Sequence, residues 1–241
     1  MKIISLINNK GGVGKTTSAV NIATYLAAKN NRVLLIDLDS QANATAYIGI
    51  NYSSEGSNKI FTDEDPIIQE TKYKNLYIIP ATKNLIDIEE NIKENAETKL
   101  RNYLNNNNEF DFVILDCPPA ISLVTINALV ASNYTLIPTK ISKFDLDGFE
   151  NLFNIIDLVK NDFNSNLKIL GIFITMDRKI KLYREIKEEL KNEVGELLLN
   201  TSISISSPIC RSTFEQKPIV TKNCKASKEY KELAEEILCR I

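Results

Sequence analysis

The sequence contains no histidine among its 241 residues. This absence excludes a Ser-His-Asp triad, a Cys-His pair and any zinc site with an imidazole ligand. Proton transfer must therefore use carboxylates, lysine, tyrosine or water. Cysteine is also scarce, and Cys117, Cys210, Cys224 and Cys239 form no C-x-x-C pair. Their wide spacing argues against a metal cage or a disulfide scaffold and favours reduced thiols.

Long apolar runs are absent as well. No run of roughly 18 apolar residues occurs, so no transmembrane helix is expected. The apolar start of the chain becomes polar at Asn8, too early for a signal-peptide core. The 29 basic and 31 acidic residues give a net charge of −2. This balance excludes a chain that coats nucleic acid with its whole surface but allows a local basic patch. We expect a cytoplasmic protein.

Short apolar runs alternate with helical patterns along the chain. The continuous runs at 33–36 and 112–115 suit parallel strands that are covered on both faces. The alternation predicts an α/β fold with a doubly wound, mainly parallel sheet flanked by helices, built as one domain over 1–241. The expected strands are 3–7, 33–36, 76–79, 112–115, 134–137, 169–174 and 197–199. The expected helices are 16–29, 122–131, 146–160, 182–194 and 227–238, and the expected surface loops are 51–65 and 105–108.

A glycine-rich segment at 10–17, KGGVGKTT, follows the first expected strand and opens the first expected helix. This context is typical of a phosphate-binding P-loop. Its glycines can turn backbone N–H groups inward to form an anion site, and the helix adds its positive dipole end. Lys15 would supply a charge for the β- and γ-phosphates, and the Thr16 hydroxyl would ligate Mg²⁺. The general pattern G-x-x-x-x-G-K-[ST] is missed only at Asn9, beside which Lys10 stands.

Carboxylates stand where two of the expected strands end. Asp116 closes an apolar strand, and a parallel sheet presents ligands at that edge. Asp37 and Asp39 are two residues apart, so an extended chain would project both to one side. In a protein without histidine, such a carboxylate is a candidate for positioning an attacking water. Each of the three could instead have a purely structural role, as a cap or turn residue.

These motifs resemble a known family. The segment 10–17 resembles the deviant Walker A motif of the ParA/MinD group of P-loop ATPases. The segment 33–45, VLLIDLDSQANAT, resembles the one that follows in ParA-type proteins, and 110–119, FDFVILDCPP, resembles their Walker B strand and second switch. Further similar segments are 75–81 and 225–238, and the weakest similarity is at 51–70 and 196–212.

The resemblance implies an ATP hydrolase for plasmid or chromosome partition, with ATP and Mg²⁺ as cofactors. Its turnover would be weak alone and stimulated by a centromere-binding, ParB-like adaptor protein. Members of this group form homodimers with ATP at the interface, and the dimer binds DNA without sequence preference. The resemblance therefore also implies a nucleoid-associated protein. With no segment ahead of the first strand, we expect sequence-specific binding to reside in a separate protein.

The resemblance also assigns roles to residues. Lys10 would reach across the dimer to the partner's phosphates, and Asp39 would orient the attacking water. The implied catalytic residues are Lys10, Lys15 and Asp39, and the implied metal-binding residues are Thr16, Asp37 and Asp116. The implied nucleotide-binding residues are Lys10, Gly11, Gly12, Val13, Gly14, Lys15, Thr16, Thr17 and, near the base, Met176. The implied DNA-binding residues are Arg211, Lys217, Lys222, Lys225 and Lys228, although the family's Arg-rich segment is here SISSPIC at 204–210.

Two alternatives remain open on the sequence. The first is a MinD-like positioning ATPase that acts on a membrane or a protein scaffold. A membrane helix of that kind would carry a Lys- and Arg-rich polar face, whereas the polar face of 227–241 is mixed to acidic, so we expect no membrane binding. The second is a nucleotide-dependent scaffold with negligible turnover. An iron–sulfur reductase of similar fold is disfavoured by the arrangement of the cysteines.

Overall fold

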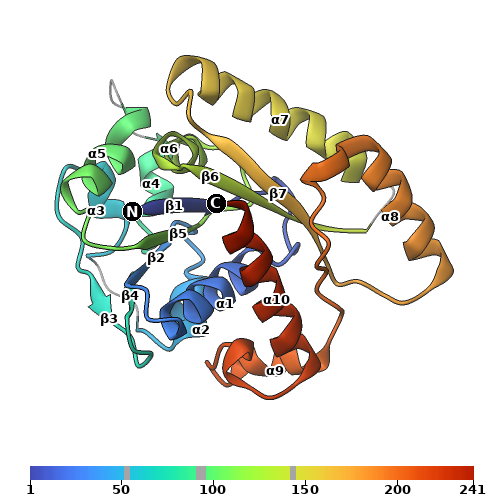
Figure 1. Cartoon of the computed structure of the whole chain (residues 1–241). Helices are drawn as coiled ribbons and strands as arrows, with labels where there is room; N and C mark the ends of the chain where they lie inside the picture. The colour runs from blue at the N-terminus through green and yellow to red at the C-terminus, as the bar shows by residue number, and fades with distance from the viewer. Residues whose placement is uncertain (52–54, 91–95, 142–144) are drawn as a thin grey trace.

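The sheet has the strand order β3-β4-β2-β5-β1-β6-β7 in the computed structural model, which describes residues 1–51, 55–90, 96–141 and 145–241 (Figure 1). Adjacent strands are parallel except for β3, which is antiparallel to β4 at the edge. This confirms the prediction of a mainly parallel sheet. The strands are β1 (Lys2–Leu6), β2 (Val33–Asp37), β3 (Gln69–Glu70), β4 (Leu76–Ile79), β5 (Phe112–Asp116), β6 (Tyr134–Lys140) and β7 (Lys168–Thr175).

Helices cover both faces of the sheet (Figure 1). One layer contains α5, α6 and α7, and the opposite layer contains α1, α2 and α10. The helices are α1 (Lys15–Ala28), α2 (Asn43–Ile48), α3 (Asn58–Phe61), α4 (Leu85–Glu90), α5 (Lys99–Asn106), α6 (Leu123–Ala131), α7 (Asp145–Asp162), α8 (Lys181–Val194), α9 (Ser207–Phe214) and α10 (Lys225–Arg240).

The central strands are apolar throughout because both of their faces are covered. In β5, Val113 and Leu115 face the core on the α6 side, whereas Phe112 and Ile114 face the core on the α1 side. Successive residues of a strand point to opposite faces, so a continuous apolar run fills two cores at once. The α10 side chains Leu233 and Ile237 are fully buried in the second core. The last helix therefore docks onto the domain.

The carboxyl ends of the parallel strands meet at one edge of the sheet. Leu6 of β1 and Asp37 of β2 are both in register with Asp116 of β5. The chain leaves β1 at this edge and enters the loop that leads into α1. The fold thus places the glycine-rich loop beside the carboxylates that follow β2 and β5.

Some predicted elements differ in the structure. The expected strand at 197–199 is wrong, because a 3-10 turn (Gly195–Leu197) ends there and only Leu198 bridges Ile172 of β7. Gly195 has φ +56°, which turns the chain sharply out of α8. The expected loop at 51–65 contains α3, with 52–54 outside the described residues, and α5 extends into the expected loop at 105–108.

Candidate nucleotide-binding site

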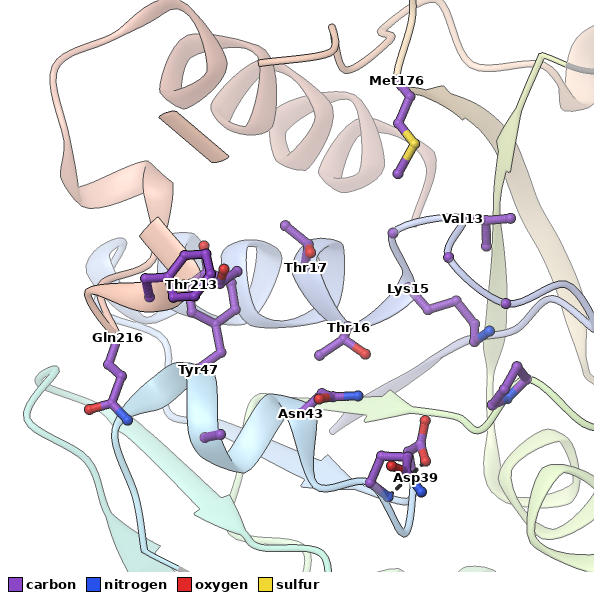
Figure 2. A pocket seen from close by; sticks show the side chains of 17 residues that line it. Val13, Lys15, Thr16, Thr17, Asp39, Asn43, Tyr47, Met176, Thr213 and Gln216 are labelled. Atoms are coloured by element: carbon purple, nitrogen blue, oxygen red, sulfur yellow. Dashed lines mark hydrogen bonds between the residues drawn. The ribbon is translucent and has the colours of Figure 1, made fainter. Parts of the chain in front are cut away.

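A cavity of about 750 Å³ opens at the carboxyl edge of the sheet (Figure 2). The glycine-rich loop and the start of α1 form one end of it, with Asp39 beside them. Helices α2 and α9 supply the other end through Tyr47 and Thr213. The lining residues are Gly11, Gly12, Val13, Gly14, Lys15, Thr16, Thr17, Asp39, Gln41, Asn43, Ala46, Tyr47, Pro119, Met176, Thr213, Phe214 and Gln216.

The loop needs glycine at two positions for conformational reasons. Gly12 has φ +68° and Gly14 has φ +83°, backbone angles that L-residues rarely adopt. A side chain at Gly12 would meet no atom within 4 Å, so the constraint there is the backbone alone. Gly11 lies outside this left-handed region. Gly14 caps the N-terminus of α1, whose dipole points its positive end into the cavity.

The Lys15 side chain lies almost buried within this loop, with 7% of its surface exposed. Its Nζ donates hydrogen bonds to the carbonyl oxygens of Asn8 at 3.0 Å and Lys10 at 3.3 Å. Burial lowers the pKa of Lys15, and the nearby Asp116 and Asp39 carboxyls act in the opposite direction. A cation held in this way at the N-terminus of α1 suits the phosphates of a nucleotide.

Two side chains tie the loop to the sheet. Asn8 donates from Nδ2 to the Pro138 carbonyl at 2.8 Å and accepts the Lys10 N–H at 2.9 Å. The Thr175 hydroxyl, at the end of β7, lies 2.9 Å from the carbonyl oxygen of Val13. Both side chains are buried, so the loop is fixed before any ligand arrives.

Asp116 is the most unusual group at the site. Its carboxylate is fully buried, and neither oxygen has a hydrogen-bond partner among the described residues. Burial raises the pKa of Asp116 well above its usual value, and the neighbouring Asp37 adds to this effect. The Thr16 hydroxyl and the Lys15 ammonium act in the opposite direction. An orphaned buried carboxylate next to a threonine hydroxyl fits a hard divalent cation such as Mg²⁺.

Asp37 has partners on both carboxylate oxygens. Oδ2 accepts the Thr45 N–H at 2.8 Å and the Thr45 hydroxyl at 2.7 Å, and Oδ1 accepts the Asp39 N–H at 3.2 Å. Burial nevertheless raises the pKa of Asp37 to about 6. These contacts tie the end of β2 to α2. The expected role of Asp37 in the magnesium shell stays a prediction, and in the structure it is an anchor for α2.

Asp39 lies in the wall of the cavity with 8% of its surface exposed. Its Oδ1 accepts the Gln41 N–H at 3.0 Å, and its carbonyl accepts the Ala42 N–H at 2.8 Å. Ala42 has φ +51°, a conformation that costs a non-glycine residue energy and persists only where its surroundings impose it. The strained turn directs the Asp39 carboxylate toward the glycine-rich loop (Figure 2).

Several lining residues have no sequence motif that marks them. Tyr47 lies on α2, and Thr213 and Phe214 end α9, about 200 residues after the glycine-rich loop. Phe214 lies at the rim of the cavity, with 89% of its surface exposed. Beyond the glycine-rich loop and Asp39, Met176 is also expected here from the sequence, and this residue, with φ +52° after β7, lies above the loop in Figure 2. Tertiary packing, which no local pattern encodes, brings the others together.

The remaining expected site residues lie outside this cavity. Lys10 is half-buried in the glycine-rich loop but does not line the cavity of its own chain. The expected DNA-binding residues lie on α9, on the segment after it and on the start of α10. Lys222 pairs with Glu215 and Lys225 pairs with Glu229, whereas Arg211, Lys217 and Lys228 have no ion pair within the described parts of the chain.

Metal binding at this site would depend on a bound ligand. No group of three or more Asp, Glu or Cys side chains that could hold a metal ion occurs in the ranges that the structure describes. A cation held by Thr16 and Asp116 would therefore need oxygens from a phosphate, which is the usual arrangement for Mg²⁺. In the same ranges, no helix combines the length and the apolar character needed to cross a membrane.

Three features stand together at one edge of a mainly parallel sheet: the glycine-rich loop after β1, Lys15 buried within that loop, and the Asp116 carboxylate at the end of the neighbouring strand β5. Together they define a P-loop nucleoside-triphosphate-binding protein. The family model AAA_31, described as "AAA domain", matches residues 1–169. The chromosome partitioning protein ParA of Myxococcus xanthus is 35% identical over 254 residues, which cover 99% of this chain and 88% of that protein. The sporulation initiation inhibitor protein Soj of Bacillus subtilis is 35% identical over 247 residues, covering 98% of each.

A comparison with solved structures also finds a similar partition protein. The crystal structure of a putative plasmid partition protein from Borrelia burgdorferi, bound to AMPPNP, superposes with a TM-score of 0.85 at 31% identity. The match covers 100% of this chain and 99% of that one. The chain belongs to the ParA/Soj family of P-loop partitioning ATPases. The resemblance found in the sequence is thereby confirmed.

Proposed function

We propose that this protein is a Mg²⁺-dependent ATPase that partitions plasmid or chromosomal DNA. The observation that carries the proposal is the pairing of a preformed phosphate loop with the orphaned carboxylate of Asp116. Relatives with the names of chromosome partitioning proteins match along the whole chain, and a plasmid partition neighbour was crystallised with an ATP analogue. These findings support ATP as the nucleotide and DNA segregation as the process.

The side chains divide the chemistry between them. Lys15 and the amides of the glycine-rich loop would hold the β- and γ-phosphates, and Thr16 and Asp116 would hold Mg²⁺, with Asp37 nearby. When bound, the metal neutralises charge on the phosphate oxygens. Asp39 would orient the attacking water, since its carboxylate points toward the glycine-rich loop from the wall of the cavity (Figure 2). Met176 would contact the nucleotide above the loop.

A second copy of the chain would complete the site. Lys10 stands on the glycine-rich loop yet does not line its own cavity, which fits a lysine that reaches the phosphates of a partner subunit. The highly exposed Phe214 at the cavity rim supports burial by a second subunit, because a large apolar ring is unfavourable in water. A second cation near the γ-phosphate would offset the charge that develops during transfer. We propose an ATP-dependent homodimer on this basis.

The dimer would bind DNA without sequence preference through the basic residues on and after α9. A centromere-binding, ParB-like adaptor would then stimulate hydrolysis, and the protein would be cytoplasmic and associated with the nucleoid. The membrane-based alternative has less support, since α10 buries its apolar face in the core on the α1 side of the sheet. We propose no membrane partner.

The test measures binding of the protein to nonspecific duplex DNA with ATP and Mg²⁺, with ADP and Mg²⁺, and without nucleotide. We expect binding only with ATP and a steep loss of affinity with salt, because lysine–phosphate contacts release counterions. Sedimentation with anionic lipid vesicles under the same conditions should show no binding. The proposal would be contradicted by DNA binding whose affinity is independent of nucleotide and of salt concentration. It would also be contradicted by vesicle binding that requires ATP.

A further inference from the structure

The hydroxyl of Tyr47 forms a buried junction between three helices. It lies 2.6 Å from the Ser212 hydroxyl on α9 and accepts a hydrogen bond from Nδ2 of Asn21 on α1 at 3.3 Å. Asn21 and Ser212 are fully buried, and Tyr47 is 3% exposed. Buried polar groups of this kind hold a single arrangement, because moving one leaves another without a partner.

Each helix at this junction also contacts the nucleotide site. On α1, Nδ2 of Asn21 donates to the carbonyl oxygen of Thr17, a cavity-lining residue, at 2.7 Å. On α2, the Thr45 hydroxyl and N–H bond to Asp37, at the strand end beside Asp116. The junction therefore connects both the start of α1 and the carboxylate edge to α9.

Helix α9 is held to the rest of the molecule by few buried groups. Ser212 is its one buried residue, and its hydroxyl also donates to the carbonyl oxygen of Ile209 at 2.6 Å. Just after the helix, the Gln216 carbonyl accepts a hydrogen bond from Nζ of Lys72 at 2.9 Å. Ile209 of α9 packs against the core but is only partly buried, so the position of α9 depends strongly on the Tyr47–Ser212 contact.

Two functional surfaces meet on this helix. Thr213 and Phe214 line the nucleotide cavity, and the exposed Arg211 and Lys217 belong to the proposed DNA-binding surface. A shift of α9 would move both surfaces together.

We propose that Tyr47 and Ser212 are positioning residues that couple the nucleotide site to the DNA-binding surface by fixing α9. This inference rests on the proposed function and adds to it the route of the coupling. ATP that fills the cavity selects the placement of α9 in which its basic residues face DNA. Linkage then requires that DNA strengthen ATP binding by the same factor by which ATP strengthens DNA binding.

The experiment uses Ser212→Ala in the full chain, with Ser227→Ala as the matched control. Ser227 is also buried, but within the described residues its hydroxyl bonds to the carbonyl oxygen of Val220 alone, at 3.1 Å. DNA affinity is measured with and without ATP, and ATP affinity with and without DNA. Two ratios follow: the DNA affinity with ATP divided by that without ATP, and the ATP affinity with DNA divided by that without DNA. In Ser212→Ala, both ratios should fall by about fivefold, which corresponds to the free energy of one buried hydrogen bond. ATP affinity without DNA should match that of Ser227→Ala.

A second variant, Tyr47→Phe, tests the same contact from the other side and also serves if Ser212→Ala fails to fold. It should lower both ratios by at least the same factor, because it removes the Tyr47–Ser212 contact and also the hydrogen bond from Asn21. The double variant should lower them little further than Tyr47→Phe alone, because the two changes share the Tyr47–Ser212 contact. If both single variants keep the two wild-type affinity ratios, the proposed role of Tyr47 and Ser212 in the coupling is wrong, while the proposed function stays intact. If the wild-type protein binds DNA equally well with and without ATP, both the proposed function and this inference are wrong.

Discussion

The hydroxyl of Thr175 lies 2.9 Å from the carbonyl oxygen of Val13, and this contact joins the end of β7 to the glycine-rich loop. Thr175 is 3% exposed, and its methyl carbon would be 3.5 Å from a side chain at Gly14. The glycine-rich loop is therefore supported by a strand whose next residue, Met176, also lines the cavity.

Replacing Thr175 by valine should weaken ATP binding by about fivefold, because one hydrogen bond to the loop is lost while the shape of the side chain is kept. Isothermal titration with a non-hydrolysable ATP analogue checks this. The control is Thr135→Val, a buried threonine of β6 whose hydroxyl faces the Ser5 carbonyl at 3.4 Å. An equal effect in both variants would show that the loss is one of general stability.

Lys15→Ala should reduce ATP affinity by about 100-fold or more, since hydrogen bonds to charged groups contribute about 1.5–3 kcal/mol each and Lys15 would make several. Its buried Nζ, bonded to two loop carbonyls, is already placed for this role. Lys168→Ala, at the opposite edge of the sheet, serves as the control. Unchanged ATP affinity in Lys15→Ala would remove the phosphate-loop assignment.

The local part of this site could be predicted from the sequence, and the tertiary part could not. The roles of Gly12, Gly14 and Lys15 follow from a contiguous motif whose geometry is set by neighbouring residues. Asp116 could be placed because parallel strands end at a common edge. By contrast, α2 and α9 are short and lack a long apolar period, so no pattern indicated that Tyr47 and Ser212 would meet.

The prediction of a strand at 197–199 was wrong for a similar reason, since tertiary structure and not the local pattern decides the conformation there. Leu198 bridges β7 like a strand residue, but Gly195 bends the chain and a 3-10 turn intervenes. An apolar run of three residues does not distinguish a single bridge from a full strand.

Asp39→Ala should keep ATP-dependent dimerisation and slow ATP hydrolysis by about 100-fold or more, the usual contribution of a positioned general base. Asp39 lines the cavity, and its carboxylate accepts a hydrogen bond from the Gln41 N–H within its own turn, so its loss leaves the phosphate loop unchanged. Phosphate release reports turnover, and size-exclusion chromatography with ATP reports the dimer. The exposed Asp157 supplies the control variant Asp157→Ala. Equal turnover in the two variants would remove Asp39 from the mechanism.

Asp116→Asn should stabilise the nucleotide-free protein near neutral pH and weaken binding of Mg²⁺-ATP. Burial raises the pKa of Asp116 in the folded state, whereas the unfolded chain ionises near 3.8. As pH rises from about 4, the unfolded state loses its proton first, so the folded wild type loses stability until its own pKa is passed. Asparagine removes this penalty, which we expect to be about 1–3 kcal/mol at pH 8.

Urea denaturation at pH 4 and pH 8 checks the sign of this effect. The stability difference between Asp116→Asn and the wild type should grow with pH, and Asp157→Asn should show no such trend. A variant that is less stable than the wild type at pH 8 would mean that the Asp116 carboxylate has stabilising partners in the folded protein.

The basic residues near α9 should differ in their contribution to DNA binding. Lys217 and Lys228 have no ion pair within the described residues, whereas Lys225 lies 3.0 Å from Glu229 and also bonds to Ser204. A lysine already paired with a carboxylate must break that contact to meet a phosphate, so its net contribution to DNA binding is smaller.

Lys217→Ala and Lys228→Ala should therefore each weaken ATP-dependent DNA binding. Each should also lower the slope of log affinity against log salt concentration by about 1. Lys225→Ala should lower the slope less, and Lys168→Ala should leave it unchanged. Equal slopes in all four variants would place the DNA-binding surface elsewhere on the protein.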